Sequence, residues 1–390
     1  MTRKARSSSI KATRWKNSER KSYSLPSAGL VFFCIMSTFC FALILRNSDA
    51  AIEYMGKGLK LCATTVIPSL FPFMVISELL VGSGVGESLG RLFARPMRWL
   101  FGLSGAGGCA VFLGSLCGFP IGAKTAVSLY DKNIISKVEV EHLLTFSNNP
   151  SSAFLISAVG ISLFSNRKLG VLMYATVLIC GFAVGIVSRF FMRVKDSTEQ
   201  HRHFPTGIRS GGIEIFTDAV SHASSGMLLV CAYVIFFSSL TGALTCMLEE
   251  VGEIPSALKA ILFGILEISG GVSAASELNG LYAAVVLATA VAGWSGLSVH
   301  FQIMTLCGGR GISFRPYIIA KLFQGLLCAV VMGILLRVIP SEWLTSASDT
   351  YLETALFSLT GALEGFTVPA VISNAVFILG WLGMALRRQD

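Results

Sequence analysis

Long apolar runs are the feature that most restricts how this chain can fold. Each of them approaches or exceeds the roughly 20 residues that a helix needs to cross about 30 Å of hydrocarbon. Only 14% of the residues are charged, whereas a soluble domain contains about 25%. The sequence therefore predicts an all-α, polytopic membrane protein. Clear predicted spans are Leu25–Leu45, Leu169–Met192, Met227–Met247, Tyr317–Ile339 and Phe366–Leu386. A further helix is predicted over roughly Leu59–Val81.

The basic residues, which give the chain a net charge of +9, lie mainly between the apolar runs. There they indicate membrane topology rather than a surface for nucleic acid, so we expect no nucleic-acid partner. The first 24 residues contain eight Lys or Arg and one Glu. This bias predicts that both termini are cytoplasmic. The ten cysteines form no CxxC motif and are interpreted as buried small residues, not as disulfides or zinc ligands.

The alternation of the loops divides the chain into two opposed halves. Residues 105–165 must begin inside the cell and finish outside, and residues 259–304 must do the reverse, yet each region contains two apolar segments. We therefore expect about eight transmembrane helices plus two re-entrant hairpins, arranged in inverted-topology repeats. The expected parts are a basic cytoplasmic tail (1–24), N-terminal helices (25–104), a first repeat (105–192), a cytoplasmic loop (193–221), a second, inverted repeat (222–339), and an extracytoplasmic loop with a C-terminal helix (340–390).

Helix-breaking residues interrupt the two repeats at four places. The breaks are Gly118–Gly122 and Asn148–Ser152 in the first repeat, and Ser269–Gly271 and Gly293–Gly296 in the second. A broken helix leaves backbone N–H and C=O groups without partners, which hydrocarbon cannot supply. Breaks at corresponding places in two opposed halves are typical of a transporter's binding site, where helix N-termini face an anionic group. Ordinary packing kinks are the alternative interpretation.

Charged side chains accompany these breaks. Lys124 would attract a carboxylate, or it would extend its ammonium group to the membrane surface. Glu267 is interpreted as a site for a coupling proton or cation, as a partner for Lys124, or as part of a structural ion pair. His300 is a candidate proton relay or a structural histidine. Glu78 and Lys321 lie in other predicted spans and are assigned only structural roles.

Polar residues at the breaks have two interpretations as well. Ser151 and Ser152 are placed to cap the helix that follows them, or to line a site. Ser298 shares one helix face with Ser295 and with Gln302. The expected solute-binding residues are Phe119, Pro120, Gly122, Lys124, Asn148, Asn149, Ser151, Glu267, Ser269, Gly270, Gly271, Trp294, Ser295, Gly296, Ser298, His300 and Gln302.

The segments around the breaks resemble those of a known family. They resemble the YlbJ-like sporulation integral membrane proteins, which contain a gate domain related to parts of concentrative nucleoside transporters. The resemblance extends over most of the chain after residue 25. The segments that carry it are Gly118–Lys124 (GFPIGAK), Val138–Leu144, Phe146–Pro150, Leu266–Gly271 and Gly293–Gln302.

Two positions depart from the family pattern. The family leads us to expect a tyrosine where Phe119 stands, and a Cys-Asn-Asn-Ser-Gly-like sequence where Ser147–Ser151 reads Ser-Asn-Asn-Pro-Ser. The resemblance implies transport of dipicolinic acid across the outer forespore membrane during sporulation. Dipicolinate is a rigid aromatic dicarboxylate, which would suit helix N-termini and Lys124, with Phe119 and Trp294 beside its ring.

The sequence thus predicts a carrier of a small polar or anionic solute in a bacterial cell membrane. A carrier requires the four breaks to meet around a polar cavity, whereas a non-transporting scaffold of the spore envelope requires tight packing there. A nucleoside transporter is a second alternative. An enzyme ranks last, because no HExxH, GxSxG, Walker or dinucleotide-binding motif occurs. The expected partners are the solute and the lipid bilayer, with a homo-oligomer left open, and no cofactor or metal is expected apart from a coupling proton or cation.

Overall fold

The computed structural model describes residues 28–82, 86–192, 212–252 and 254–340, and all its regular elements are helical. The chain divides into two units, residues 1–42 and 43–390. Most of α1 (Ala28–Arg46) belongs to the first unit and agrees with the predicted span Leu25–Leu45. The predicted basic tail and the predicted helix Phe366–Leu386 lie outside the described residues.

The second unit begins with short helices rather than with one span over Leu59–Val81. Pro72 lies inside α3, and proline has no N–H to donate to the helix ladder. With 16 residues, α3 is shorter than the roughly 20 that a crossing requires. The elements are α2 (Ser48–Leu61), a π-helical segment (Cys62–Val66), α3 (Ile67–Gly82), α4 (Gly86–Pro96), a second π-helical segment (Met97–Phe101) and a 3-10 turn (Gly105–Gly107).

The remaining helices repeat one order of elements. In each repeat a pair of short helices is followed by a second broken pair and then by a long helix. We call residues 108–191 the first repeat and residues 256–338 the second. The first contains α5 (Gly108–Cys117), α6 (Ile121–Asp131), α7 (Lys137–Phe146), the π-helix η4 (Ala153–Leu163) and α8 (Arg167–Phe191). The second contains α10 (Ser256–Leu266), α11 (Ile268–Ser276), α12 (Leu281–Trp294), α13 (Gly296–Cys307) and α14 (Arg315–Val338).

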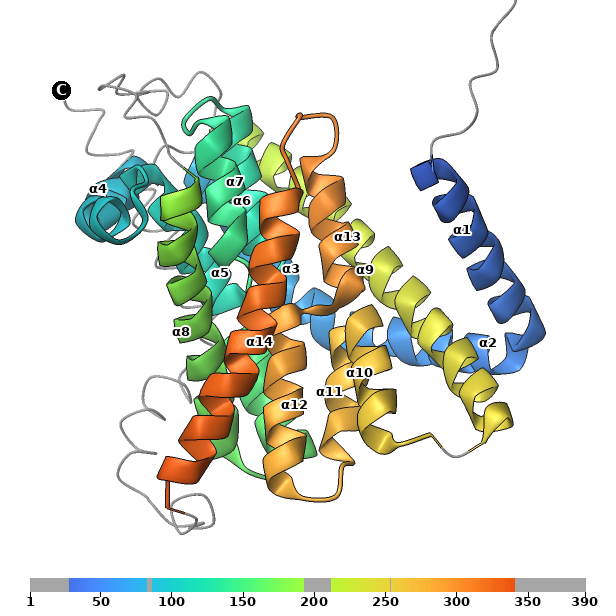
Figure 1. The fold of residues 1–390 in the computed structure, drawn as a ribbon. Coiled ribbons are helices and arrows are strands. Elements are labelled where there is room, and N and C mark those ends of the chain that lie inside the picture. Colours follow the sequence, from blue (N-terminus) through green and yellow to red (C-terminus); the bar gives the residue numbers. More distant parts are fainter. Residues whose placement is uncertain (1–27, 83–85, 193–211, 253, 341–390) are drawn as a thin grey trace, which may run out of the picture. The chain divides into compact units, whose positions relative to one another are not determined.

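The two repeats run in opposite directions. In Figure 1 the α6–α7 and α13–α14 loops lie at the top, whereas the η4–α8 and α11–α12 loops lie at the bottom. An ion pair of 2.7 Å between Arg310 and Asp131 joins the two upper loops. The α5–α6 hairpin therefore opens toward one end of the bundle and the α10–α11 hairpin toward the other.

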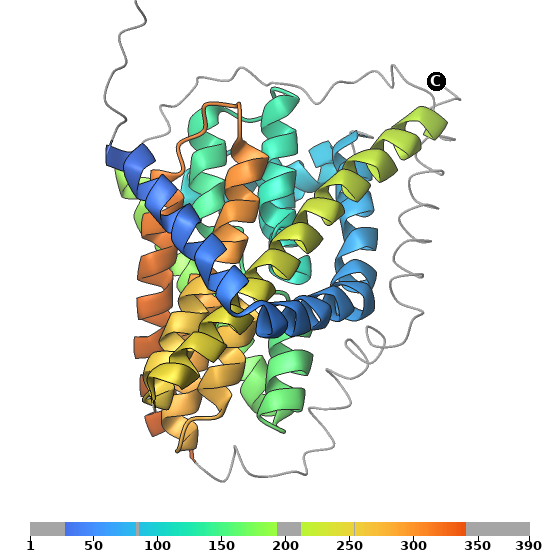
Figure 2. The same cartoon turned by 90° about the vertical axis from the view of Figure 1, so that its right-hand side faces the viewer.

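A long helix, α9 (Gly212–Val251), connects the two repeats. It begins inside the predicted loop 193–221, so part of that loop is helical. Figure 2 shows α9 crossing the bundle obliquely, with α2 lying against it. The close approach uses Gly58, where an added Cβ would lie 2.8 Å from Ser238 Oγ.

Four helical segments among the described residues are long and apolar enough to cross a membrane. Three of them confirm the predicted spans in α8, α9 and α14, and the fourth consists of α12 and α13 together. Two further pairs of helices, each sharply bent at a short break, would raise the number to six if each pair were one span. The chain is therefore a multi-pass membrane protein. The predicted number of eight is not reached within the described residues.

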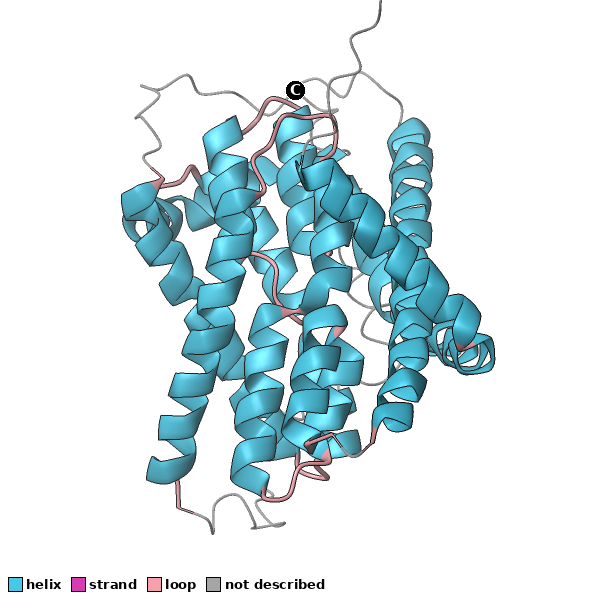
Figure 3. Ribbon diagram, turned by 45° about the vertical axis from the view of Figure 1, so that its right-hand side comes forward, coloured by secondary structure: helices cyan, strands magenta, loops and turns pink. Residues whose placement is uncertain are grey.

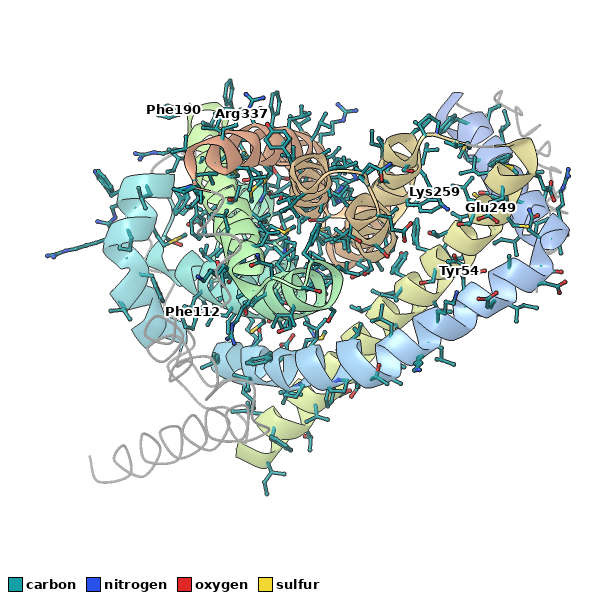
Figure 4. The ribbon with its side chains drawn as sticks, turned by 90° about the horizontal axis from the view of Figure 1, so that it is seen from below. Tyr54, Phe112, Phe190, Glu249, Lys259 and Arg337 are labelled. Carbon is teal, nitrogen blue, oxygen red and sulfur yellow. The ribbon has the colours of Figure 1, made fainter. Side chains whose placement is uncertain are left out.

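The last described helix, α14, has its polar face inward. Lys321 and Gln324 are fully buried on that face. Its opposite face is a continuous apolar stripe, as expected for a helix surrounded by lipid. Figure 4 likewise shows Phe190 of α8 projecting from the outer side of the bundle. The exposed residues of the α14 stripe are Ile319, Leu322, Phe323, Leu326, Val330 and Ile334.

Candidate functional site

The first break lies where the sequence predicts it. Helix α5 ends at Cys117 and α6 starts at Ile121. Gly118 has a φ of 81°, a conformation that residues with a Cβ adopt rarely. An added Cβ at Gly118 would also lie 2.5 Å from Ser151 N. The glycine therefore permits both the turn and the contact with the second break.

The second break separates α7, which ends at Phe146, from η4, which starts at Ala153. The side chain of Ser151 accepts a hydrogen bond of 3.1 Å from Phe154 N, which confirms the predicted cap. Ser152 makes no capping hydrogen bond with its side chain. The six residues between the two helices leave a longer stretch of bare backbone than any other break.

The first and second breaks are hydrogen-bonded to each other. Phe119 N donates to Asn149 O at 2.9 Å, and Ala123 N donates to Asn148 Oδ1 at 3.0 Å. The tip of the α5–α6 hairpin is therefore held by the backbone and the amide groups of the second break. Figure 3 shows the loop segments of the breaks partway along the bundle, away from the loops at its ends.

The third break differs from the prediction. It lies at Glu267, which has extended backbone angles, and the predicted breakers Ser269–Gly271 lie inside α11. The carboxylate of Glu267 accepts a hydrogen bond of 2.8 Å from Gly270 N. The helix restarts at residue 268 because this side chain satisfies an N–H group of its first turn. Glu267 is therefore the cap of α11 and does not contact Lys124.

The fourth break confirms the prediction and consists of a single residue. Ser295 has a φ of 78° and ends α12 immediately before α13 begins at Gly296. An added Cβ at Gly296 would lie 3.0 Å from Glu267 Cα. The third and fourth breaks are thus in contact, as the first and second are.

Both helical hairpins depend on a pair of facing glycines. An added Cβ at Gly122 would overlap the carbonyl oxygen of Ser147 and lie 3.1 Å from Gly114 Cα. In the second repeat, an added Cβ at Gly271 would overlap Gly264 Cα. Gly122 and Gly271 were predicted to line the site. The structure shows that both are closely packed against backbone atoms.

Lys321 of α14 lies at the second break, although the sequence assigned it no functional role. Its Nζ atom contacts the backbone oxygen of Asn148, Asn149 Oδ1 at 3.3 Å and Gln324 Oε1 at 2.8 Å. Gln324 Nε2 in turn donates to Asn149 Oδ1 at 2.7 Å and to Val177 O of α8 at 3.0 Å. This network fixes the second break of the first repeat against the last helix of the second repeat.

The partner of Lys124 is on α3, not on the segment around Glu267 that the sequence analysis considered. Its ammonium lies 3.6 Å from Glu78 of α3, and both side chains are 9% exposed. It also donates a hydrogen bond of 2.8 Å to His222 O of α9. The predicted pairing of Lys124 with Glu267 is therefore replaced by pairing with Glu78, because the capping contact keeps Glu267 at α11.

Three of the predicted residues carry buried polar atoms without a hydrogen-bond partner among the described residues. These atoms are Asn148 Nδ2, His300 Nε2 and Gln302 Oε1. The other ring nitrogen of His300, Nδ1, is 2.9 Å from the hydroxyl of Tyr317, and Gln302 Nε2 is 3.4 Å from Ser298 Oγ. An unpaired buried polar atom costs about 1–3 kcal/mol, so these atoms favour a bound polar group.

A narrow crevice joins the first break to α13 and to α9. Its empty volume is about 200 Å³, but it is not wide enough to hold a water molecule. The polar cavity that a carrier requires is therefore not open in this conformation. The crevice is lined by Met74, Pro120, Lys124, Gly226, Leu229, Val230, Gln302 and Leu306.

The two predicted aromatic residues, Phe119 and Trp294, have different surroundings. Phe119 packs against two core clusters, one formed largely by α6, α7 and α13 and the other by α8, α10, α11 and α12. Trp294 packs edge-on against His300, with 4.3 Å between the ring centroids. Phe119 therefore lies where residues of both repeats meet, whereas Ser269 and Gly270 lie on the α10–α11 hairpin.

Three polar residues that contact the predicted site residues were not predicted to belong to the site: Glu78, Lys321 and Gln324. Their position inside apolar spans could have identified them, because charged or amide side chains there usually face the interior of the bundle. That signal could not identify their partners, because Lys321 meets Asn148 across 173 positions of the chain.

The sequence is similar to that of a known sporulation protein. The sporulation integral membrane protein YlbJ of Bacillus subtilis (strain 168) is 29% identical over 341 residues, which cover 79% of this chain and 84% of that protein. The comparison confirms the family resemblance: this chain is YlbJ-like. No family model and no solved structure matches it.

Proposed function

We propose that this YlbJ-like protein is a carrier that moves a small anionic solute across the membrane. The observation that carries the proposal is that buried polar atoms lack partners at the second break and in α13, the helix after the fourth break. They are Ser147 Oγ, Asn148 Nδ2, His300 Nε2 and Gln302 Oε1. Membrane interiors tolerate broken helices only where protein, water or a ligand completes the hydrogen bonds. A solute that binds at these atoms would complete them.

The charges at the breaks favour an anion. Lys124 is paired with Glu78, whereas Lys321 is surrounded by neutral oxygens. The positive charge of Lys321 is therefore not balanced by a carboxylate within 4.0 Å among the described residues. By resemblance the solute is dipicolinic acid, whose two carboxylates complement a positive interior.

The same proposal includes a membrane orientation. The α5–α6 and α10–α11 hairpins would be re-entrant from opposite faces, and the predicted helix Phe366–Leu386 would complete about eight spans. Arg189 and Arg310 lie toward the end of the bundle that carries the α6–α7 and α13–α14 loops. By the positive-inside rule this end would face the cytoplasm, with both termini on that side. By resemblance the membrane is the outer forespore membrane.

Alternating access would open the crevice beside Lys124. The crevice lies between residues of the first break and residues of α3, α9 and α13. It is closed in this conformation, so solute entry requires α6 to separate from α9. The bond between Lys124 and His222 O, together with the contact between Lys124 and Glu78, would have to exchange for contacts with the solute.

A non-transporting scaffold of the spore envelope is the second candidate function. The close packing of the hairpin glycines and the closed crevice favour it. A scaffold, however, gives no reason for unpaired polar atoms in the interior. The two candidates therefore differ in whether the protein binds and moves a solute.

Uptake into proteoliposomes tests the proposal directly. Labelled dipicolinate, a labelled nucleoside and a neutral pyridine would be compared, each with and without a pH gradient. The carrier proposal expects uptake of dipicolinate above that of empty liposomes and of the neutral analogue. Uptake equal to that of empty liposomes under all conditions would favour the scaffold, and uptake of the nucleoside alone would favour the second transport alternative.

A variant in the crevice sharpens the same assay. Gln302→Glu places a carboxylate in the crevice that contains Lys124, so it should compete with an anionic solute and raise the KM for dipicolinate at least ten-fold. Lys259→Met is the control, because it also makes the net charge more negative by one, but at the far end of α10, where Lys259 lies 3.9 Å from Glu249 (Figure 4). An unchanged KM in Gln302→Glu would remove the crevice from the solute path.

A further inference from the structure

Oxygen atoms surround the Nζ atom of Lys321. Three oxygens face its Nζ atom: the backbone oxygen of Asn148, Asn149 Oδ1 and Gln324 Oε1. None of them carries a formal charge. Oxygens of unwound backbone and of amide groups are the ligands that transporters use for coupling ions at broken helices.

The orientation of both amide groups is set by other contacts. Asn149 Nδ2 donates to Phe146 O at 2.9 Å, so its oxygen must point toward Lys321. Gln324 Nε2 donates to Val177 O at 3.0 Å, so its oxygen must do the same. The protein therefore presents these oxygens to the Lys321 position through hydrogen bonds that do not involve Lys321.

The number of oxygens around Nζ fits a charged Lys321 side chain. An ammonium group has three N–H donors and no acceptor, whereas a neutral amine has only two N–H donors and a lone pair. Three oxygens can all accept from an ammonium, but one of them would face the lone pair of a neutral amine. The ligand set therefore matches a cation.

We propose that Lys321 supplies the protein's own cation to this three-oxygen site, in the place where a free monovalent cation would otherwise bind. The ammonium is covalently attached to α14 and bridges α7 and α8 through the network, so the second break keeps its form without an inorganic ion. Resting on the carrier function proposed above, the inference means that solute uptake requires neither Na⁺ nor K⁺.

The two buried lysines differ in a way that supports this role. Lys124 has the carboxylate of Glu78 at 3.6 Å, so it forms an ordinary ion pair. The N–H groups of Lys321 are all directed at neutral oxygens, and none is left for a solute. Lys321 therefore contributes charge and holds the break, and it is a positioning residue rather than a solute contact.

Chemical rescue provides the test. The variant Lys321→Ala removes Cγ, Cδ, Cε and Nζ, which together correspond to propylammonium. We expect its thermal unfolding midpoint to fall by several degrees and to rise again with propylammonium chloride, and to a smaller extent with ammonium chloride. Lys321→Met fills the space without a charge, so it should lose stability and gain nothing from either cation. Lys259→Ala is the control, because its lysine is partly exposed and far from the breaks.

The unmodified protein gives the second measurement. Its unfolding midpoint and its solute uptake should be the same in sodium, potassium and N-methylglucamine chloride at equal ionic strength. A dependence on Na⁺ or K⁺ would overturn the inference even if Lys321→Ala cannot be purified. A purified Lys321→Ala protein that is as stable as the unmodified one, or that no cation restores, would also overturn it.

The unfolding measurement needs no solute, which separates this inference from the proposed function. A protein that passes the rescue test but moves no solute would refute the carrier and leave the cation site intact. A protein that moves dipicolinate only with Na⁺ or K⁺ would refute the cation site and leave the carrier intact.

Discussion

The two repeats solve the same problem of broken helices in different ways. In the first repeat, bare segments separate α5 from α6 and α7 from η4. These two segments hydrogen-bond to each other, and Lys321 and Gln324 of α14 hold the second one. In the second repeat each break is a single residue, Glu267 or Ser295. Glu267 satisfies the break with its own carboxylate.

This difference indicates which repeat is the more easily rearranged. A break that is held by its own side chain keeps its form when neighbouring helices move. A break that is held from α14 depends on the position of α14, and it therefore responds to movement between the repeats. In a carrier we expect the first repeat to change its local structure and the second repeat to act as the more rigid partner.

The largest expected effect tests the packing of the first repeat. Gly122→Ala would place a Cβ against the carbonyl oxygen of Ser147, and backbone on both sides cannot move away easily. We expect a loss of about 3 kcal/mol in unfolding free energy and loss of uptake. Gly56→Ala is the control, since an added Cβ there has no atom within 4 Å. A Gly122→Ala protein with the stability of the control would show that the first repeat is already loosely packed.

Two adjacent glycines in the second repeat provide a matched pair. Gly271→Ala should cost about 2 kcal/mol, because its Cβ would overlap Gly264 Cα. Gly270→Ala should be close to neutral, because the nearest atom to its Cβ would be Thr241 Cγ2 at 3.6 Å. Thermal unfolding of the two purified proteins measures the difference. Equal midpoints would contradict the packing of the α10–α11 hairpin.

Glu267 separates capping from ion coupling. Glu267→Gln keeps an oxygen that can accept from Gly270 N, so stability and uptake should be nearly unchanged. Glu267→Ala removes the cap and should cost about 1 kcal/mol. Uptake measured with and without a pH gradient decides the matter. If Glu267→Gln abolished only the response to the gradient, Glu267 would carry a coupling proton, and the second repeat would no longer be the passive partner.

The smallest expected effect concerns the ion pair between the α6–α7 and α13–α14 loops. Arg310→Ala removes the ion pair with Asp131. The side chain of Arg310 is 36% exposed and that of Asp131 is 42% exposed. Exposed pairs contribute about 0.2–1 kcal/mol and are screened by salt. We expect a small fall in the unfolding midpoint at low ionic strength that disappears at high salt. A fall that persists in high salt would mean that the loops are coupled by more than this pair.

Much of the fold follows from local properties of the sequence. The apolar runs predicted α8, α9 and α14, and Gly118 and Ser295 marked real breaks because their neighbours leave the helix no continuous ladder of hydrogen bonds. The third break was misplaced by two residues or more, because the sequence shows two glycines but not that Glu267 caps the helix. Local propensity favours a break at Gly270-Gly271, and the packing of Gly271 on Gly264 overrides it.

The sequence by itself determined the class of this protein, because a run of some 20 apolar residues has one stable solution in hydrocarbon, and it determined that polar groups interrupt those runs. It could not decide which polar groups meet. Lys321 was assigned no functional role, and Lys124 lacked its partner Glu78, because both pairings join helices that are distant in the chain. Contacts of that kind depend on how helices pack against one another, and only the tertiary structure decides that.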